Sequence, residues 1–297
     1  MDTRPITEDD ISTCRDIFYA SFVAFHRQHG MEEEEPADPN WLVPILQHFL
    51  HTDQTGGRIA TQDGNPIGFA STILRDRYWF LSFLFVLPDS QGMGVGRQLL
   101  GELVPEEGGA GTVRSTVVES FQPVSTGLYA SFGMTPRAIK YWLSGLSRPE
   151  VLPQLPADLR KAEMTQADLG DVLALDRSIL GFGRTADHEW WAKAGTPSLV
   201  YRRGDDLVAY AYVDDGYIGP ALATDEETLC SAVADIVRTS DDPASMAVNI
   251  CGDSATVFQM LVNAGSRIDE SAKYRFVYCS SSGPLPPSYI HHSDWLP

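Results

Sequence analysis

A glycine-rich turn in the first half of this sequence is the part best suited to chemistry. Gly92, Gly94 and Gly96 alternate along it, and Arg97 follows directly. The apolar stretch before the turn stops at Pro88 and an amphipathic stretch follows, so the turn should join a buried strand to the start of a helix. Free backbone N–H groups at a helix start, the helix dipole and missing β-carbons together favour a phosphate anion. We therefore predict that this turn binds a diphosphate, with the Arg97 guanidinium within reach of a phosphate.

Two common phosphate-binding patterns do not fit this turn. A P-loop ends in Gly-Lys followed by Ser or Thr, whereas the sequence here reads Gly96-Arg97-Gln98. A dinucleotide-binding turn needs the spacing G-x-G-x-x-G close to the first strand of its unit. The glycines here are spaced G-x-G-x-G and follow a strand in the middle of the first half. The sequence therefore excludes both patterns as the source of the diphosphate site.

The elements that must hold this turn alternate between strand and helix patterns. Residues 78–87 are almost all apolar, as in a central strand that is buried on both faces. The turn Asp63-Gly64-Asn65-Pro66 separates two strand patterns and predicts a β-hairpin. The patterns of the first half predict strands at 3–6, 58–61, 67–74, 78–87, 112–118 and 140–146, and helices at 11–25, 41–50, 95–104 and 124–132.

The turn and a second segment together resemble the GNAT superfamily of acetyl-CoA-dependent N-acetyltransferases. The family signature Gln/Arg-x-x-Gly-x-Gly/Ala is matched by Gln91-x-x-Gly94-x-Gly96, and the preceding strand ends in the Val-x-Pro pattern at Val86-Leu87-Pro88. Further downstream, residues 127–134 read Gly-Leu-Tyr-Ala-Ser-Phe-Gly-Met and are similar to the family's Leu-Tyr-x-x-x-Gly-Phe segment. The two motifs stand in the family's order, and the resemblance covers residues 3–146.

The resemblance implies a place for each part of acetyl-CoA, and no metal. The main chain of one strand would pair with the pantetheine arm in the way that an added β-strand does, and the glycine turn would hold the pyrophosphate. Where that strand splays from its neighbour, a backbone N–H could polarise the thioester carbonyl. The implied cofactor-binding residues are Leu84, Phe85, Val86, Gln91, Gly92, Met93, Gly94, Val95, Gly96, Arg97 and Gln122, the last replacing an asparagine that many members carry.

The resemblance also implies a catalytic tyrosine and raises the question of a base. Tyr129 stands where many members place a phenol that protonates the leaving thiolate; the alternative is a core tyrosine with a satisfied hydroxyl. The position that often carries a glutamate base is Val117 here. Glu119 lies two residues further on and would share that face of an extended strand. Glu119 is therefore a candidate base, and a solvated carboxylate at a strand end is the alternative.

Other chemically capable residues have simpler interpretations. Glu32–Glu35 could recruit a cationic amine, although such a run is usually a solvated loop. His48 and His51 are spaced like a metal pair but lack matched ligands. The four cysteines show no C-x-x-C spacing, so we expect buried free thiols and no zinc site. His291 and His292 lie in a Ser- and Pro-rich tail and are expected to be exposed.

Composition excludes several classes of protein. The 297 residues carry a formal net charge of −18 and neither half is basic, which disfavours a nucleic-acid partner. The longest apolar run, at 79–87, is too short to cross a bilayer, and the acidic N-terminus lacks the apolar core of a signal peptide. We expect a cytoplasmic globular protein of two domains, whose acidic surface serves solubility and could attract a cationic amine.

The second half repeats the order of elements with little sequence identity. Its counterpart of the glycine turn places Thr224 and Glu227 as a capping box, with Asp225 and Glu226 in the first helical turn. These side chains would satisfy the helix start and repel a diphosphate. The patterns predict strands at 199–203, 207–213, 217–223, 247–250 and 274–279, and helices at 169–180, 189–193, 226–237 and 256–262.

The sequence therefore predicts an α/β protein of two GNAT-like domains in tandem. The domains are expected at 1–147, with acetyl-CoA bound, and at 156–280, degenerate, followed by a tail at 281–297 that is mobile or packs as an extended arm. The expected activity is acetyl transfer to a primary amine of a small molecule by direct attack, with a protein amine or a longer acyl donor left open. The alternative is a non-catalytic acyl-CoA sensor.

Overall fold

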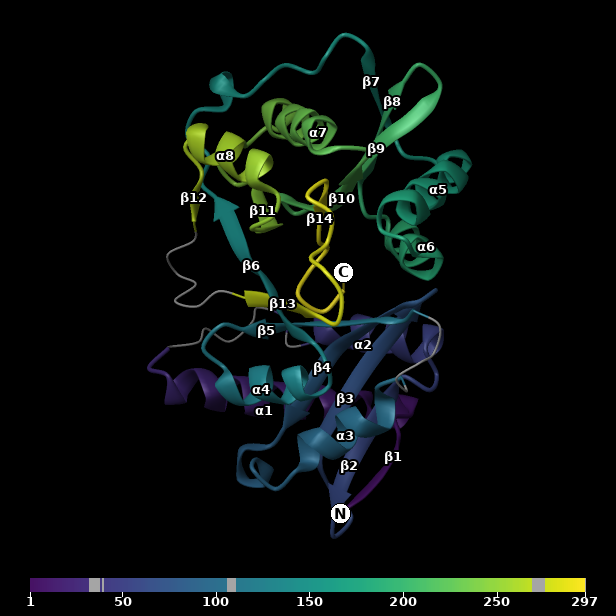
Figure 1. Cartoon of the computed structure of the whole chain (residues 1–297), viewed down its shortest axis with the longest axis vertical. Coiled ribbons are helices and arrows are strands. Elements are labelled where there is room, and N and C mark those ends of the chain that lie inside the picture. The colour runs from purple at the N-terminus through teal and green to yellow at the C-terminus, as the bar shows by residue number, and fades with distance from the viewer. Residues whose placement is uncertain (32–37, 39, 106–110, 269–275, 297) are drawn as a thin grey trace. The chain divides into compact units, whose positions relative to one another are not determined.

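The computed structural model describes residues 1–31, 38, 40–105, 111–268 and 276–296. The chain divides into two compact units (Figure 1). Unit 1 comprises Met1–Thr116 with Gly127–Met134, and unit 2 comprises Val117–Thr126 with Thr135–Pro297. The predicted domains, 1–147 and 156–280, were defined partly by their expected function, so their boundaries stay predictions.

Unit 1 is built on a mixed sheet in the order β1-β2-β3-β4-β5. All neighbouring strands are antiparallel except β4 and β5, which are parallel. The last residues of β5 and the first residues of α4 belong to unit 2. The strands are β1 (Asp2–Pro5), β2 (Gly57–Gln62), β3 (Asn65–Arg75), β4 (Tyr78–Val86) and β5 (Val113–Glu119), and the helices are α1 (Ile11–Gln28), α2 (Leu42–Thr52), α3 (Val95–Leu103) and α4 (Pro123–Ser131).

A β-bulge interrupts β4 at Ser82. Leu81 pairs with Thr72 and Phe83 pairs with Ser71, so Ser82 is the extra residue on its strand. The parallel pairing of β4 with β5 reaches only Leu81 and Thr116. Among the described residues of unit 1, the part of β4 beyond the bulge is paired with β3 alone. One edge of β4 therefore lacks a partner strand within this unit.

Helices cover both faces of this sheet. Because successive side chains of β4 point to opposite faces, the strand contacts helices on both of them. The Phe18 ring of α1 lies 6.2 Å from the Phe83 ring and 4.7 Å from the Phe85 ring. On the other face, a β-carbon at Gly68 would lie 3.2 Å from Val86 and 3.3 Å from Val95 of α3. The near-continuous apolar run of β4 thus serves two cores at once.

Unit 2 has a similar mixed sheet in the order β7-β8-β9-β10-β11-β6-β13, with β12 beside β6 and β14 beside β10. Its strands are antiparallel to their neighbours except for the parallel pair β10 and β11. The strands are β6 (Thr135–Ser144), β7 (Leu159–Glu163), β8 (Ser198–Arg203), β9 (Asp206–Asp214), β10 (Tyr217–Ala223), β11 (Ala247–Cys251), β12 (Arg267–Ile268), β13 (Phe276–Ser280) and β14 (Tyr289–Ile290), and the helices are α5 (Leu169–Ile179), α6 (Thr185–Ala194), α7 (Glu226–Thr239) and α8 (Ala255–Asn263). The predicted α/β class is confirmed.

Strand β6 comes from the first half of the sequence but packs in unit 2. It was expected at 140–146 and begins earlier, at Thr135. Leu143 pairs with Val248 of β11, and Ile139 pairs with Val277 of β13. The second half therefore builds its sheet around a strand supplied by the residues that precede it.

The C-terminal tail packs as an extended arm. Its strand β14 pairs with β10, and His291 is only 1% exposed. The prediction that His291 is exposed is wrong, because the strand pairing carries this residue into the interior of unit 2. His292 is half-buried and its ring stacks on Trp191 at a centroid distance of 5.1 Å.

The four cysteines are free and buried, as predicted. Burial raises the pKa of the Cys14, Cys230 and Cys251 thiols to about 12 and that of Cys279 to about 11.

None of the helices in the described ranges combines the length and the apolar composition that a bilayer span needs.

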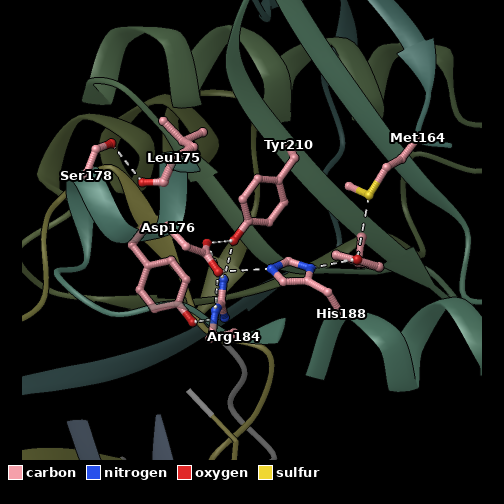
Figure 2. Close-up of polar contacts among 9 residues, drawn as sticks. Met164, Leu175, Asp176, Ser178, Arg184, His188 and Tyr210 are labelled. Atoms are coloured by element: carbon pink, nitrogen blue, oxygen red, sulfur yellow. Dashed lines mark hydrogen bonds and ion pairs between the residues drawn. The ribbon is translucent and has the colours of Figure 1, made fainter. Parts of the chain in front are cut away.

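A polar cluster is buried in the interior of unit 2 (Figure 2). Asp176 accepts hydrogen bonds from Arg184 Nε at 3.2 Å and from the Tyr210 hydroxyl at 2.6 Å. His188 contacts Asp176 through Nε2 at 3.0 Å and the Tyr212 hydroxyl through Nδ1 at 2.8 Å. Burial alone would raise the pKa of Asp176, but the Arg184 charge and the His188 hydrogen bond outweigh it and lower the pKa to about 2.

This cluster should make the stability of unit 2 depend on pH. Since the folded-state pKa of Asp176 lies near 2 against an ordinary 3.8, its stabilisation is complete above about pH 4 and is lost as the pH falls towards 2. We expect Asp176→Asn to be less stable than wild type by a constant margin above pH 5. Denaturant unfolding should show that margin shrinking between pH 4 and pH 2. A margin that stays constant down to pH 2 would contradict the assignment.

Candidate functional site

The chain turns sharply after β4 and is tied back to the end of that strand. Pro88 to Ser90 form a single 3₁₀ turn, and the Leu87 N–H donates to Ile67 O at 2.9 Å. The Gln91 side-chain amide donates to Val86 O at 2.9 Å. Gln91, predicted as a cofactor-binding residue, thus braces the turn against the strand.

Glycine is required at two positions of the turn by its backbone. Gly92 has a φ of +76° and Gly94 a φ of +86°, in the left-handed region that residues with a β-carbon rarely adopt. A β-carbon at either position would meet no atom within 4 Å. Packing therefore does not explain these glycines, and the space in front of them is open to solvent.

The start of α3 presents unpaired backbone amides. Gly94 is the N-cap residue and no side chain caps the helix. The Gln98 N–H donates to Gly94 O at 3.0 Å, whereas the backbone N–H groups of residues 92–97 donate no hydrogen bond to the residues that the structure describes. Residues 91–94 are exposed, so these donors can reach a ligand. Such a group of donors with the helix dipole behind it suits an anion.

Arg97 adds a full positive charge to the first turn of α3. Its side chain is exposed, and the guanidinium carbon lies 5.7 Å from the centroid of the Phe132 ring. A cation–π contact of this kind holds the side chain beside the turn while leaving its N–H groups available.

The structure brings the predicted strand and turn together. A β-carbon at Gly96 would lie 3.8 Å from Leu84 and 3.9 Å from Val86, so α3 packs closely on β4. Val86 O accepts hydrogen bonds from Gln91 and, at 3.0 Å, from the Ser21 hydroxyl of α1. Ser21 was not predicted from the sequence, although a buried serine on the apolar face of α1 could have signalled a bond to the main chain of the sheet.

Tyr129 lies in unit 1 on the last turns of α4. It is 6% exposed, and its carbonyl accepts the N–H groups of Phe132 and Met134 at 3.0 Å each. The neighbouring Leu128 would contact a β-carbon at Gly96 at 3.6 Å. The segment that carries Tyr129 thus packs beside the glycine turn, and the catalytic role of Tyr129 stays a prediction.

Glu119 and Gln122 lie in unit 2, at the turn that starts α4. The Gln122 N–H donates to Glu119 O at 3.0 Å, and Gln122 O accepts the Thr126 hydroxyl at 2.8 Å. Both residues are half-buried. Their predicted roles as base and as cofactor contact stay predictions.

The counterpart of the glycine turn in unit 2 is closed by acidic side chains. Asp225 is the N-cap residue of α7 and accepts hydrogen bonds from Thr228 N–H at 2.7 Å and from the Thr228 hydroxyl at 3.0 Å. Glu226 accepts the Thr256 N–H at 2.7 Å. The prediction of Thr224 as the cap was wrong by one residue, but the carboxylates expected at this helix start are present.

The acidic run in the first half and the pair of histidines were also predicted as chemically capable features. The Glu32–Glu35 run lies outside the described residues. His48 is buried, while His51 contacts Glu8 at 3.1 Å. Among the described residues, no cluster of three or more His, Cys, Asp or Glu side chains could hold a metal.

Residues 13–134 match the sequence model of the acetyltransferase (GNAT) family. They form a GNAT acetyltransferase domain. The matched range begins within α1, includes β4, the glycine turn and α3, and ends just after Tyr129 and α4. Membership of this domain in the family supports acyl transfer from an acyl-CoA. No curated protein matches the chain.

Solved structures with similar folds span the whole chain. A putative acetyltransferase from Pyrococcus horikoshii has a TM-score of 0.75 at 15% identity, over 100% of this chain and 95% of that one. A tandem GNAT protein from the clavulanic acid biosynthesis pathway has a TM-score of 0.59 at 14% identity, over 95% and 99%. A GCN5-related N-acetyltransferase from Sphaerobacter thermophilus has a TM-score of 0.57 at 14% identity, over 97% and 98%. At these identities the likeness concerns the fold, and it confirms the predicted tandem of two GNAT-like domains.

A β-carbon at Gly94 should damage anion binding more than it damages the fold. We expect Gly94→Ala to weaken coenzyme A binding at least tenfold, because the turn must rearrange and its amides no longer converge. Gly204→Ala is the matched control, since Gly204 also has a positive φ (+63°) and no atom within 4 Å of an added β-carbon. Both variants should lose about 1 kcal/mol of stability. Equal coenzyme A affinity of the two variants, measured by calorimetry, would contradict the site.

Proposed function

We propose that the first half of the chain transfers the acetyl group of acetyl-CoA to a primary amine of a small molecule. The observation that carries this proposal is the start of α3, where amides of an exposed turn are left unpaired by two glycines of positive φ. A pyrophosphate accepts hydrogen bonds from such donors, and Arg97 adds a charge-assisted contact. The GNAT domain at 13–134 supports acyl-CoA as the donor.

The edge of β4 beyond the bulge suits the pantetheine arm. Leu84 to Val86 are half-buried and, within unit 1, are paired on one side only. An amide-containing arm can add to such an edge as an extra strand would. This would bring the thioester towards Ser82, whose hydroxyl is buried and has no hydrogen-bond partner among the described residues.

The proposed reaction is a direct displacement in a ternary complex. The amine nitrogen forms a bond to the acetyl carbonyl carbon, and the carbon–sulfur bond breaks as the tetrahedral intermediate collapses. The Tyr129 hydroxyl gives its proton to the departing thiolate, and Glu119 takes the proton that the amine loses. The formal charge of −18 favours a cationic amine as the acceptor and disfavours a nucleic acid.

A turnover assay tests this function. Release of free coenzyme A thiol from acetyl-CoA is followed across a panel of small primary amines and amine-bearing peptides. Acceptor-dependent thiol release with a small amine supports the proposal. Tight acyl-CoA binding without release for every acceptor would overturn it and point to an acyl-CoA sensor.

Removing the Tyr129 hydroxyl should slow the chemical step. We expect Tyr129→Phe to lower kcat by about 100-fold with unchanged coenzyme A affinity, because a general acid acts in the transition state and not in donor binding. Tyr78→Phe, at another buried tyrosine of unit 1, is the control and should keep wild-type kcat. A Tyr129→Phe enzyme with full kcat would leave Tyr129 a core residue.

A base at Glu119 matters most when the amine arrives protonated. We expect Glu119→Gln to lower kcat/KM by about 100-fold at pH 7, and much less near pH 10, where the acceptor amine is largely neutral. Glu163→Gln, at an exposed carboxylate of unit 2, should follow wild type across the profile. A pH–rate profile with the same deficit at every pH would exclude the base role.

A further inference from the structure

The C-terminal segment, residues 288–296, joins the sheet of unit 2 through the two-residue strand β14, which pairs with β10. Ile290 pairs with Ala221 and Tyr289 with Leu222, and Ala223 N–H donates to Ser288 O at 3.0 Å. Figure 1 shows β14 beside β10 and β11 within unit 2. The segment is buried at both ends, with exposures of 1% or less at Tyr289, Ile290, His291 and Leu296, and is half-buried at residues 292–295. It is therefore part of the interior and not a loose end.

This strand fills a slot that the sheet of unit 2 would otherwise leave open. β10 pairs in parallel with β11 only at Tyr217 and Ile218, and a bulge on β10 follows before Ala221. β4 of unit 1 has the same design, with short parallel pairing to β5 and a bulge at Ser82. Among the described residues of unit 1, no strand lies on the free edge of β4 beyond that bulge. Within the described residues of unit 1, β4 thus has an unpaired edge at the position where β10 of unit 2 pairs with the C-terminal segment.

The backbone of β10 is adapted to this occupant. A β-carbon at Gly219 would lie 2.4 Å from His291 O, so only glycine lets the tail approach this closely. The same carbonyl accepts the Tyr217 hydroxyl at 2.8 Å. These contacts recognise the main chain of an extended peptide rather than any one side chain.

Two side chains of the segment meet buried partners. The Tyr289 hydroxyl accepts a hydrogen bond from Arg184 Nη1 at 2.7 Å and so joins the polar cluster around Asp176. Asp294 accepts Lys140 Nζ at 2.5 Å, and the same ammonium donates to Ser293 O at 3.1 Å. Lys140 is only 2% exposed, so loss of Asp294 would leave a buried ammonium without its carboxylate. The groove thus selects a tyrosine and an acidic residue five positions apart.

We propose that the slot between β10 and β11 is a peptide-binding groove whose occupant is the C-terminal segment of the same chain. Strand pairing with β10 provides the affinity, and Arg184 and Lys140 provide the selectivity. The comparison with the open edge of β4 rests on the proposed function, whereas the groove and its occupant do not. The groove takes peptide and not acyl-CoA, since carboxylates already occupy the start of α7.

Cutting the chain beside the segment tests the groove directly. A protease site is placed in the full chain at Ser282 and Gly283, which are exposed. After cleavage the segment should remain bound through gel filtration and leave only in mild denaturant. A synthetic peptide of residues 284–297 should then rebind, as measured by calorimetry. Prompt loss of the cleaved segment from a unit 2 of unchanged stability would overturn the proposal.

Peptide variants separate specific recognition from simple adhesion. Peptides with Tyr289→Phe or Asp294→Asn should bind about tenfold more weakly than the parent, because each removes one buried contact. Pro287→Ala, at an exposed position, is the control and should bind as the parent does. Equal binding by all four peptides would overturn the selectivity.

Hydrogen exchange on the uncut chain covers the case in which the cleaved protein unfolds. Asp294→Asn should speed amide exchange of residues 289–291 at least tenfold and leave β9 unchanged. Exchange that is unaltered in the segment would overturn the proposal. These readouts need no acyl-CoA, so a failure of the proposed function would leave them standing. A second acyl-CoA bound per chain after release of the segment would overturn the assignment of the groove to peptide.

Discussion

Backbone amides at the start of α3 can face a ligand because two residues before the helix adopt positive φ angles. Gly92 and Gly94 tolerate this conformation, and the open space in front of them leaves the donors accessible. Two neighbouring contacts of unit 1 hold this turn beside β4, and a bulge shapes the strand edge next to it. Gln91 ties it to the end of β4, Gly96 packs α3 on the strand, and the bulge at Ser82 ends the pairing on the neighbouring edge.

The two units share one architecture but differ at the helix start and at the edge of the central strand. Both have a central strand with a bulge, a short parallel pairing, and a helix that starts at the end of the strand. In unit 1 the helix start is uncapped and the strand edge lacks a partner within the unit. In unit 2 Asp225 caps the helix, and β14 covers the edge.

Short-range sequence patterns predicted the elements that depend on neighbouring residues alone. Strand β4, the turn and the start of α3 were predicted from the apolar run of the strand, the stop at Pro88 and the alternating glycines. The cap of α7 was misplaced because Thr224 and Asp225 both begin a plausible capping pattern, and sequence does not show which residue leaves the helix. His291 was misjudged because its burial comes from pairing with a distant strand, which a Ser- and Pro-rich composition does not reveal. The partners of β6 depend on long-range pairing in the same way.

We propose above all that the turn before α3 binds the linked phosphates of a coenzyme. Calorimetry of the intact chain with coenzyme A, and in parallel with pantetheine, tests it most directly. We expect one coenzyme A to bind per chain and pantetheine to bind at least a hundredfold more weakly, since pantetheine lacks the diphosphate. No heat with coenzyme A, or equal affinity for the two compounds, would contradict it.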